Sequence, residues 1–349
     1  MEALILNLIA DASLAILFAV IALSLLVLTK GADLLVEEAV ALSVSWGVPK
    51  MLIGATIVSL GTTLPEASVS VLAALRGSPG LALGNAVGSI IADTGLILGL
   101  ALLLGPVPIE HALVRRQSWI QFASAVVLVV VCVPFLQLET MLIEGGRMPR
   151  AVGFVFLVLL ALYIWRSIKW SASAQPPAGD VSPVAARSRA GAVLSLLKLI
   201  AGIALVVAAS QVLIPTVELT ALRLRVPESV IAATLVAFGT SLPELVTAIT
   251  AVRRGHGDLA LGNVIGADIL NVLFVSGAAA AATPGGLQVP PPFFYLYFPS
   301  LIFVVSVLRI GIWRSRTELR RGFGFVLLAA YILTVIAGYV VSGVPTPTH

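Results

Sequence analysis

Long apolar runs separated by short polar stretches make up most of the chain. Residues 51–75, MLIGATIVSLGTTLPEASVSVLAAL, contain one ionisable side chain, Glu66. A helix crosses a bilayer with roughly 20 predominantly apolar residues. On this basis the pattern predicts ten membrane-spanning helices, at about 12–45, 49–75, 82–105, 117–138, 150–168, 192–222, 227–253, 258–281, 292–313 and 321–343. The first and sixth are longer than one straight crossing needs, as expected of a strongly tilted helix or of a span with an added surface piece.

Composition agrees with this pattern, because 59% of the 349 residues are apolar and 11% are charged. A typical soluble domain carries about 25% charged residues. The predicted fold class is therefore an all-α integral membrane protein. The N-terminus has no basic n-region and no A-x-A cleavage site, so we expect the first helix to be retained rather than removed as a signal peptide. Cys132 is the single cysteine and excludes an intrachain disulfide.

The basic residues follow the predicted topology and do not gather on a soluble face, so the formal net charge of +4 does not indicate a nucleic-acid partner. If the N-terminus lies outside, fifteen Lys and Arg residues fall on the cytoplasmic side and five on the other. Positive charge accumulates on the cytoplasmic side of membrane proteins. We expect an inner-membrane protein with both termini extracytoplasmic. Its partners are membrane lipid and small inorganic cations, and no cofactor or obligatory protein partner is indicated.

The chain contains an internal duplication. With one offset of 178 residues and no gap, GVPKMLIGATIVSLGTTLPE (47–66) aligns with RVPESVIAATLVAFGTSLPE (225–244). Under the same offset, LALGNAVGSIIAD (81–93) aligns with LALGNVIGADILN (259–271). Chance hydrophobic similarity does not keep Gly, Thr, Pro, Glu and Asn in register over such a length.

Each copy has five predicted spans, and an odd number makes the second copy enter the membrane from the opposite side. Inverted repeats whose broken helices meet near the midplane are typical of secondary transporters. We assign residues 1–170 to the first five-helix repeat, with motif 59–93, and residues 192–349 to the second, with motif 237–271. Residues 171–191, rich in Ala, Ser and Pro, are predicted to be a flexible cytoplasmic linker.

The duplicated GT[ST]LPE motif places a proline and a carboxylate inside a membrane helix. Proline has no N–H and pushes against the carbonyl four residues back, so Pro65 and Pro243 should each free a carbonyl. Free carbonyls are tolerated in lipid only where they line a cavity or bind something. The break is therefore expected to supply oxygen ligands at membrane depth, beside Glu66 and Glu244.

Hydroxyl groups share this helix face. The positions on or next to the stripe, in the two repeats, are Ser59, Thr62, Thr63, Glu66, Ala237, Thr240, Ser241 and Glu244. Calcium takes six to eight oxygen ligands at roughly 2.3–2.6 Å, and the absence of nearby Cys and His argues against zinc or copper. The alternative is that each proline is a packing kink and each glutamate reaches an interface. A charge at the centre of a span costs roughly 2.5–3.5 kcal/mol, so two glutamates at equivalent positions favour a function.

The next span of each repeat carries a second polar stripe. Asn85, Ser89 and Asp93 are spaced by four residues, and their counterparts are Asn263, Ala267 and Asn271. Asp93 is predicted to be an ion ligand or a proton carrier, and Asn271 shares its position. Two alternatives stay open for each of the remaining polar residues. Asn85 and Asn263 cap helix starts or bond between helices, and Asp268 lines the cavity or bonds a neighbouring helix.

Two further groups have a structural reading. The small-residue pairs Gly84/Gly88 and Gly262/Gly266 indicate close helix packing. Asp33, Glu37 and Glu38 align with Gln211, Pro215 and Thr216, so the repeat does not keep their charge and we read them as interfacial.

Two inverted copies of GT[ST]LPE, each followed by a GN..G[SA] span, resemble the cation/calcium exchanger superfamily, and within it the prokaryotic sodium/calcium exchangers. The resemblance covers both repeats and all ten predicted spans. It implies a fold of ten helices in two inverted repeats that exchanges Ca²⁺ for Na⁺ by alternating access, and a transporter rather than an enzyme.

The resemblance also implies ligands. Glu66 and Glu244 become calcium ligands shared with sodium, and Thr62 and Thr240 bind through carbonyls and hydroxyls. The remaining implied positions are the sodium-site hydroxyls of Thr63, Ser241 and Ser89, the outer carbonyls of Ser59 and Ala237, and the central pair Asp93 and Asn271.

The sequence departs from the family pattern at two places. The family's archaeal arrangement has Asn in the first copy and Asp in the second, whereas here Asp93 comes first and Asn271 second. Ala267 stands where a sodium-binding serine is expected, with Asp268 beside it. A proton-driven or potassium-dependent calcium exchanger therefore stays open, and a cation channel is a weaker alternative.

Overall fold

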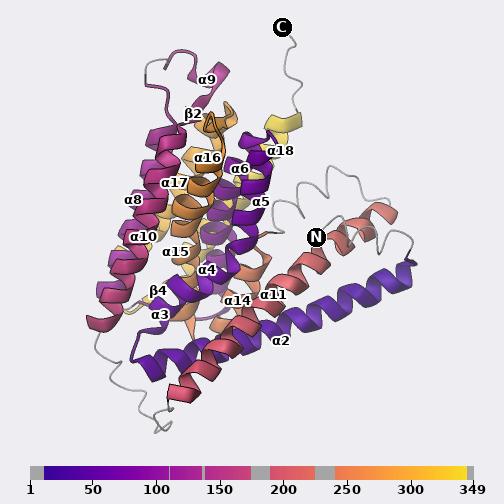
Figure 1. Cartoon of the computed structure of the whole chain (residues 1–349), viewed down its shortest axis with the longest axis vertical. Helices are drawn as coiled ribbons and strands as arrows, with labels where there is room; N and C mark the ends of the chain where they lie inside the picture. The colour runs from indigo at the N-terminus through magenta and orange to yellow at the C-terminus, as the bar shows by residue number, and fades with distance from the viewer. Residues whose placement is uncertain (1–11, 110, 136–137, 174–188, 225–239, 344–349) are drawn as a thin grey trace.

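The computed structural model describes residues 12–109, 111–135, 138–173, 189–224 and 240–343, and they are almost entirely helical (Figure 1). The helices of the first half are α2 (Leu14–Trp46), α3 (Lys50–Ile53), η1 (Gly54–Val58), α4 (Ser59–Thr62), α5 (Leu64–Leu75), α6 (Pro79–Ile91), η2 (Ala92–Ile97), α7 (Leu98–Leu104), α8 (His111–Cys132), α9 (Met141–Glu144) and α10 (Arg150–Ser173). Those of the second half are α11 (Arg189–Arg223), α14 (Leu242–Arg253), α15 (Gly257–Leu270), η4 (Asn271–Ser276), α16 (Gly277–Ala282), η5 (Phe293–Tyr297), α17 (Phe298–Arg314) and α18 (Arg321–Gly343).

The protein is an all-helical membrane protein with bent helices. Within the described residues, seven helices are long and apolar enough to span a bilayer, and the bent pair Lys50–Thr62 and Leu64–Leu75 makes an eighth. The sequence predicts ten spans, and the difference has two sources. Helix α8 lies at the fourth predicted span, but Arg115, Arg116 and two glutamines lower its hydropathy. The seventh predicted span, 227–253, begins outside the described residues and continues as α14.

The duplication seen in the sequence is also seen in the helices. α5 and α14 are both 12 residues long and start 178 residues apart, at Leu64 and Leu242. Helix α6 passes through the π-helix η2 into α7, and α15 passes through the π-helix η4 into α16. Most of the predicted linker 171–191 lies outside the described residues.

Two short antiparallel strand pairs join the halves. β1 (Val107–Pro108) pairs with β4 (Glu318–Leu319), and β2 (Gly146–Met148) pairs with β3 (Leu287–Val289). β2 lies near the top of Figure 1 and β4 near the bottom, so the pairs close opposite ends of the bundle. Each pair takes one strand from each half of the chain.

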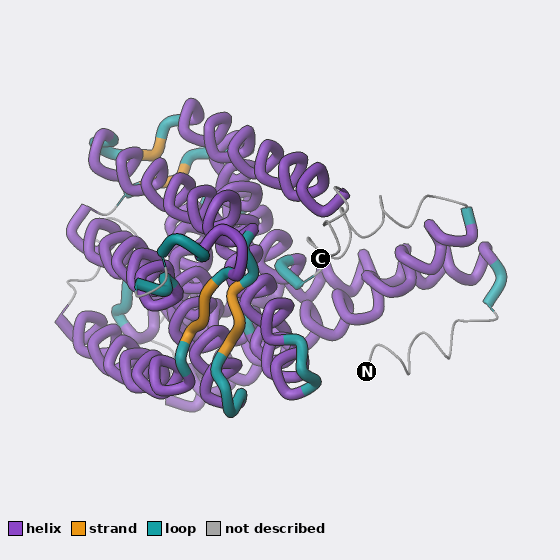
Figure 2. Tube along the Cα trace, turned by 90° about the horizontal axis from the view of Figure 1, so that it is seen from above, coloured by secondary structure: helices purple, strands orange, loops and turns teal. Residues whose placement is uncertain are grey.

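α2 and α11 are each one continuous helix, of 33 and 35 residues, and they pack against each other. Both run obliquely to the other helices and project beyond the bundle (Figures 1 and 2). Of the two alternatives for these long segments, the single oblique helix is therefore the one that forms. Glycines permit the close approach, since a Cβ on Gly202 would lie 2.8 Å from the backbone nitrogen of Leu35.

Candidate functional site

The first repeat breaks its second span at Thr63. α4 ends at Thr62, α5 begins at Leu64, and the two segments of the span meet at an angle of 43°. Pro65 occupies the first turn of α5, where a missing N–H costs little. Glu66 stands in the same turn, and Glu244 holds the equivalent place in the first turn of α14. The N-terminus of a helix carries a partial positive charge that favours a carboxylate there.

Both glutamates are buried, and each has a carboxylate oxygen without a hydrogen-bond partner among the described residues. Each side chain is 1% exposed. Neither carboxylate oxygen of Glu66 has a hydrogen-bond partner among the described residues, and neither has Glu244 Oε2. The other oxygen, Glu244 Oε1, accepts a hydrogen bond of 3.3 Å from Thr63 Oγ1, which brings the break at Thr63 next to the start of α14. A buried carboxylate without partners is costly unless a cation compensates it, so this pair is the strongest candidate for ion binding.

Asn85 connects α5 with the residues that precede α14. Its Nδ2 donates to the Glu66 carbonyl at 3.2 Å and to Ser70 Oγ at 3.0 Å. Its Oδ1 accepts from Thr240 Oγ1 at 3.3 Å. Of the two roles left open for Asn85, bonding between helices is the one that the structure shows. Asn263 is fully buried, and its amide has no partner in the described part of the chain.

The predicted central pair meets. Asn271 Nδ2 lies 3.5 Å from Asp93 Oδ2, and both side chains are 1% exposed. Asp93 Oδ1 and Asn271 Oδ1 have no partner within the residues that the structure describes. Asp93 lies in the first turn of η2 and Asn271 in the first turn of η4. Single π-helical turns of this kind occur frequently at functional sites.

Asp268 bonds neighbouring helices, which is one of its two predicted roles. Its Oδ2 accepts from Thr94 Oγ1 and from Gln121 Nε2, while Oδ1 lacks a partner in the described ranges. Thr94 directly follows Asp93, so this bond holds α15 against the turn that carries the central carboxylate. Ala267, beside Asp268, is fully buried and offers no side-chain oxygen.

The other predicted ligands differ in whether their oxygen atoms already take part in hydrogen bonds. Thr62 Oγ1 donates to the Val58 and Ser59 carbonyls, at 3.2 and 3.3 Å, so the Thr62 hydroxyl is engaged within its own helix. The Ser59 carbonyl also accepts from the Thr63 N–H at 2.9 Å. Ser89 is buried, and Ser241 Oγ has no partner among the residues described. Ala237 lies outside the described residues.

The chemistry of this set is that of hard cations. Carboxylate, hydroxyl, amide and carbonyl oxygens lie around the break at Thr63 and the start of α14, which is the ligand class of Ca²⁺ and Na⁺ rather than of zinc or copper. Within the described ranges, no three His, Cys, Asp or Glu side chains converge as a metal site. An ion here would take two carboxylates and draw its other ligands from neutral oxygens.

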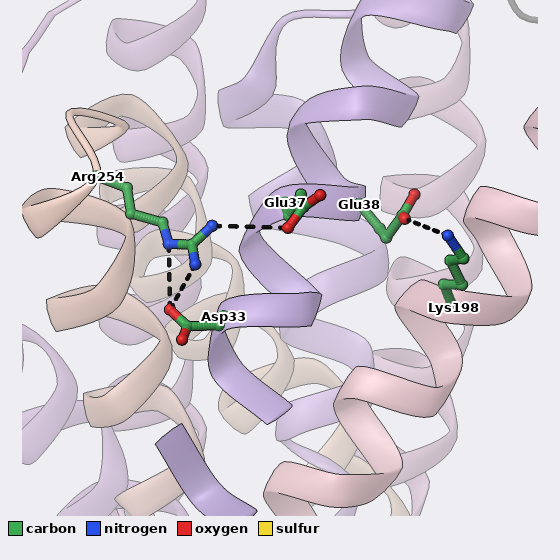
Figure 3. A network of polar contacts seen from close by, with 5 residues as sticks. All are labelled: Asp33, Glu37, Glu38, Lys198 and Arg254. Carbon is green, nitrogen blue, oxygen red and sulfur yellow. Dashed lines mark hydrogen bonds and ion pairs between the residues drawn. The ribbon is translucent and has the colours of Figure 1, made fainter. Parts of the chain in front are cut away.

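The acidic residues of α2 form ion pairs with the second half (Figure 3). Arg254 Nη2 lies 2.7 Å from Asp33 Oδ1, and Arg254 Nη1 lies 3.9 Å from Glu37 Oε2. Glu38 Oε1 lies 3.4 Å from Lys198 Nζ. The interfacial reading fits Glu37, whose side chain is 68% exposed, but not Glu38, which is buried at 3%.

Several contacts of the candidate site could not be predicted from the sequence. Thr94, Gln121 and Ser70 are ordinary polar residues of apolar helices, and only the fold brings them to Asp268 and Asn85. For Gln121 there is one usable signal, because Gln117 and Gln121 stand four residues apart on an apolar helix.

Known proteins resemble the chain over nearly its whole length. The family model described as sodium/calcium exchanger protein matches residues 16–169 and 194–340. The inner membrane protein YrbG of Escherichia coli is 33% identical over 321 residues, covering 90% of this chain and 94% of YrbG. The sodium/calcium exchanger MaX1 of Methanosarcina acetivorans is 29% identical over 343 residues, covering 91% of this chain and 97% of MaX1.

A solved structure shares the fold. The sodium-calcium exchanger NCX_Mj, in crystals soaked with Na⁺ and Sr²⁺, superimposes with a TM-score of 0.78 at 27% identity. The match covers 93% of this chain and 99% of the NCX_Mj chain.

Proposed function

Because the chain belongs to the sodium/calcium exchanger family, we propose that it exchanges Ca²⁺ for Na⁺ across a membrane by alternating access. It is a multi-pass membrane transporter of cations and not an enzyme. The observation that carries the choice of ions is the pair Glu66 and Glu244. Both are buried, and three of their four carboxylate oxygens have no partner within the described residues.

The proposed ligand set is the one that the resemblance to the family implies, and the burial of Glu66 and Glu244 supports it. Glu66 and Glu244 neutralise one Ca²⁺ and are shared among sodium ions in the other half of the cycle. Thr62, Thr240 and the carbonyls of the breaks complete the coordination. The other proposed ligands are Ser59, Thr63, Ser89, Ala237 and Ser241, with Asp93 and Asn271 at the centre and Asp268 next to them.

Exchange rather than leakage follows from electrostatics. An unoccupied site with two negative charges resists enclosure in a low dielectric, because the charges lose water without gaining a partner. A carrier that closes only when occupied cannot return empty, so after it releases ions on one side it must bind ions there before it closes again. The same argument weighs against a channel, which passes calcium without a counter-ion.

The proposed setting is the inner membrane, as in the name of the relative YrbG. We propose that both termini are extracytoplasmic, because the predicted cytoplasmic loops hold fifteen basic residues against five on the other side. In this orientation the β1–β4 pair lies on the cytoplasmic side.

A proton-driven calcium exchanger is the second candidate, and two observations favour it. Ala267 removes a hydroxyl where sodium would bind, and Asp93 and Asp268 add two buried carboxylates to the glutamate pair. Four acidic groups exceed what one calcium ion neutralises, and protons are one way to balance the remainder.

Calcium-45 uptake into proteoliposomes tests the proposal, with outward gradients of sodium, potassium and protons imposed one at a time. We expect uptake with the sodium gradient and loss of uptake in Glu66→Gln and in Glu244→Gln. Uptake driven only by the proton gradient would establish the second candidate. Undiminished transport by both variants would overturn the site, and uptake without any counter-ion would indicate a channel.

A further inference from the structure

The two asparagines at equivalent places of the repeat differ in their hydrogen bonds. Asn85 in α6 and Asn263 in α15 are related by the offset of 178 residues. The Asn85 side chain makes three hydrogen bonds, whereas the fully buried amide of Asn263 makes none with the residues that the structure describes. A buried amide without a partner is costly, because it has lost water and gained no other hydrogen bond. One copy of the motif is therefore satisfied and the other is not.

The bonds of Asn85 join the first half of the chain to the second. Its Nδ2 donates to the Glu66 carbonyl and to Ser70 Oγ, both in α5. Its Oδ1 accepts from Thr240 Oγ1, just before α14 begins at Leu242. The segment that leads into the second glutamate helix is thereby held against the first one.

The residue equivalent to Thr240 is Thr62, and its hydroxyl has a different partner. Thr62 Oγ1 donates to two carbonyls of its own helix, at 3.2 and 3.3 Å, and Asn263 has no partner among the described residues. A threonine hydroxyl can rotate from such carbonyls to another acceptor. Thr62 is therefore available to Asn263 if the two segments approach each other as Thr240 and Asn85 do.

Alternating access in inverted-repeat transporters moves one repeat against the other around a fixed site. A contact that one repeat makes in one conformation is then made by the other repeat in the opposite conformation. We infer that Asn85 and Asn263 are alternate positioning residues: Asn85 holds Thr240 in the described conformation, and Asn263 holds Thr62 in the opposite one, in which Asn85 releases Thr240. The inference rests on the proposed alternating access, and it names residues that direct the conformational change without binding the ion.

The surroundings of the two asparagines are unequal, and this sets the balance between the conformations. Ser70 Oγ donates to the Ala82 carbonyl at 3.1 Å, which leaves its lone pairs for Asn85. Ala248 stands at the equivalent place and offers Asn263 no hydroxyl. The described conformation should therefore be the more populated one without bound ions. A hydroxyl at position 248 would supply the missing acceptor and shift the population towards the opposite conformation.

Hydrogen–deuterium exchange of the purified protein tests the inference without transport. The signal is the amide protection of residues 240–245, because this segment opens when Thr240 is released. We expect Asn85→Ala to speed exchange there and Asn263→Ala to slow it, each at least about threefold, as expected for the loss of a hydrogen bond on one side of an equilibrium. A merely structural role would speed exchange in both variants, and that result would overturn the inference.

Ala248→Ser gives the same test by adding a group, so the inference stays testable if an asparagine variant does not fold. We expect it to speed exchange in residues 240–245 as Asn85→Ala does. Unchanged or slower exchange in Ala248→Ser would overturn the inference.

Calcium-45 exchange in proteoliposomes measures the consequence for transport. The half-saturating calcium concentration is determined at each face of the membrane, and Asn85→Ala and Asn263→Ala should move the ratio of the two concentrations in opposite directions. A shift in the same direction would overturn the inference. Opposite changes in deuterium exchange in a protein that carries no calcium would support the two contacts and reject the proposed cargo, so the two failures are distinguishable.

Discussion

Asn271 Nδ2 lies 3.5 Å from Asp93 Oδ2, at the point where two π-helices from opposite halves of the chain begin. The pair places one carboxylate and one amide at the centre of the candidate site. Because the two positions are related by the repeat, an exchange of the two residues preserves this chemistry while moving the charge to the other half.

The first prediction concerns this exchange. Asp93→Asn alone removes the central carboxylate and should weaken calcium binding at least about tenfold, since calcium affinity follows the charge of the ligand set. The double variant Asp93→Asn with Asn271→Asp restores one carboxylate and should recover most of the lost affinity. Calcium-45 flux against calcium concentration measures both. If the double variant bound calcium as weakly as Asp93→Asn alone, positions 93 and 271 would not be equivalent in the candidate site.

The second prediction concerns Thr63, which donates to Glu244 Oε1 at 3.3 Å. Thr63→Val keeps the shape and removes the donor, and Thr63→Ser keeps the hydroxyl. A hydrogen bond to a charged group contributes about 1.5–3 kcal/mol. We expect Thr63→Val to raise the sodium concentration for half-maximal exchange about tenfold or more, and Thr63→Ser to stay close to the parent. Equal values for Val and Ser would exclude a role for the hydroxyl.

The third prediction compares a glycine at a tight contact with a glycine at an open position. A Cβ on Gly266 would lie 2.6 Å from the Ala55 Cα and from Ser59 Oγ, whereas a Cβ on Gly322, at the exposed start of α18, meets no described atom within 4 Å. Overpacking of a tight contact costs about 1–3 kcal/mol. Gly266→Ala should lower the unfolding temperature in detergent and reduce flux, while Gly322→Ala leaves both near the parent values. A comparable loss in the two variants would contradict the packing that separates them.

The fourth prediction concerns Asp268, which accepts from Thr94 and Gln121. Asp268→Asn replaces a charged acceptor by a neutral one and should reduce stability by about 1–3 kcal/mol. Gln121→Leu removes one donor of the same set, so the two effects should not add. Thermal unfolding of the single variants and the double variant forms the cycle. Additive losses would mean that Asp268 and Gln121 act independently.

The fifth prediction concerns Arg254, which joins α2 to the loop after α14 through Asp33 (Figure 3). The pair is partly exposed, with side-chain exposures of 38% and 32%, so it should contribute only about 0–1 kcal/mol to stability. Arg254→Asp places like charges together and should slow exchange, and Asp33→Arg in the same chain should restore it. Stopped-flow calcium uptake gives the rates. A rate in the double variant no better than in Arg254→Asp would exclude the pairing.

Much of this arrangement can be predicted from the sequence, because its signals are local or repeated. Pro65 and Glu66 predict a helix break that carries a carboxylate. Their copies, Pro243 and Glu244, predict the same local structure in the second half of the chain. The bent second span and the meeting of Asp93 with Asn271 are both found in the structure.

What could not be predicted depends on contacts between distant segments. Gln121 reaches Asp268 across 147 residues, and nothing in either local sequence gives their relative register. The burial of Glu38 beside α11 has the same origin, because a charged residue near the end of an apolar helix is normally interfacial. The strands β1 to β4 were not expected at all, since two or three residues are too few to carry a pattern.

The strand pairs also make each half of the chain depend on the other half for its structure. β1 and β2 belong to the first half, and their partners β4 and β3 belong to the second, so neither half can close its own two ends. Cutting the chain between the halves should therefore leave the two pieces connected at both ends of the bundle, through β1–β4 at one end and β2–β3 at the other.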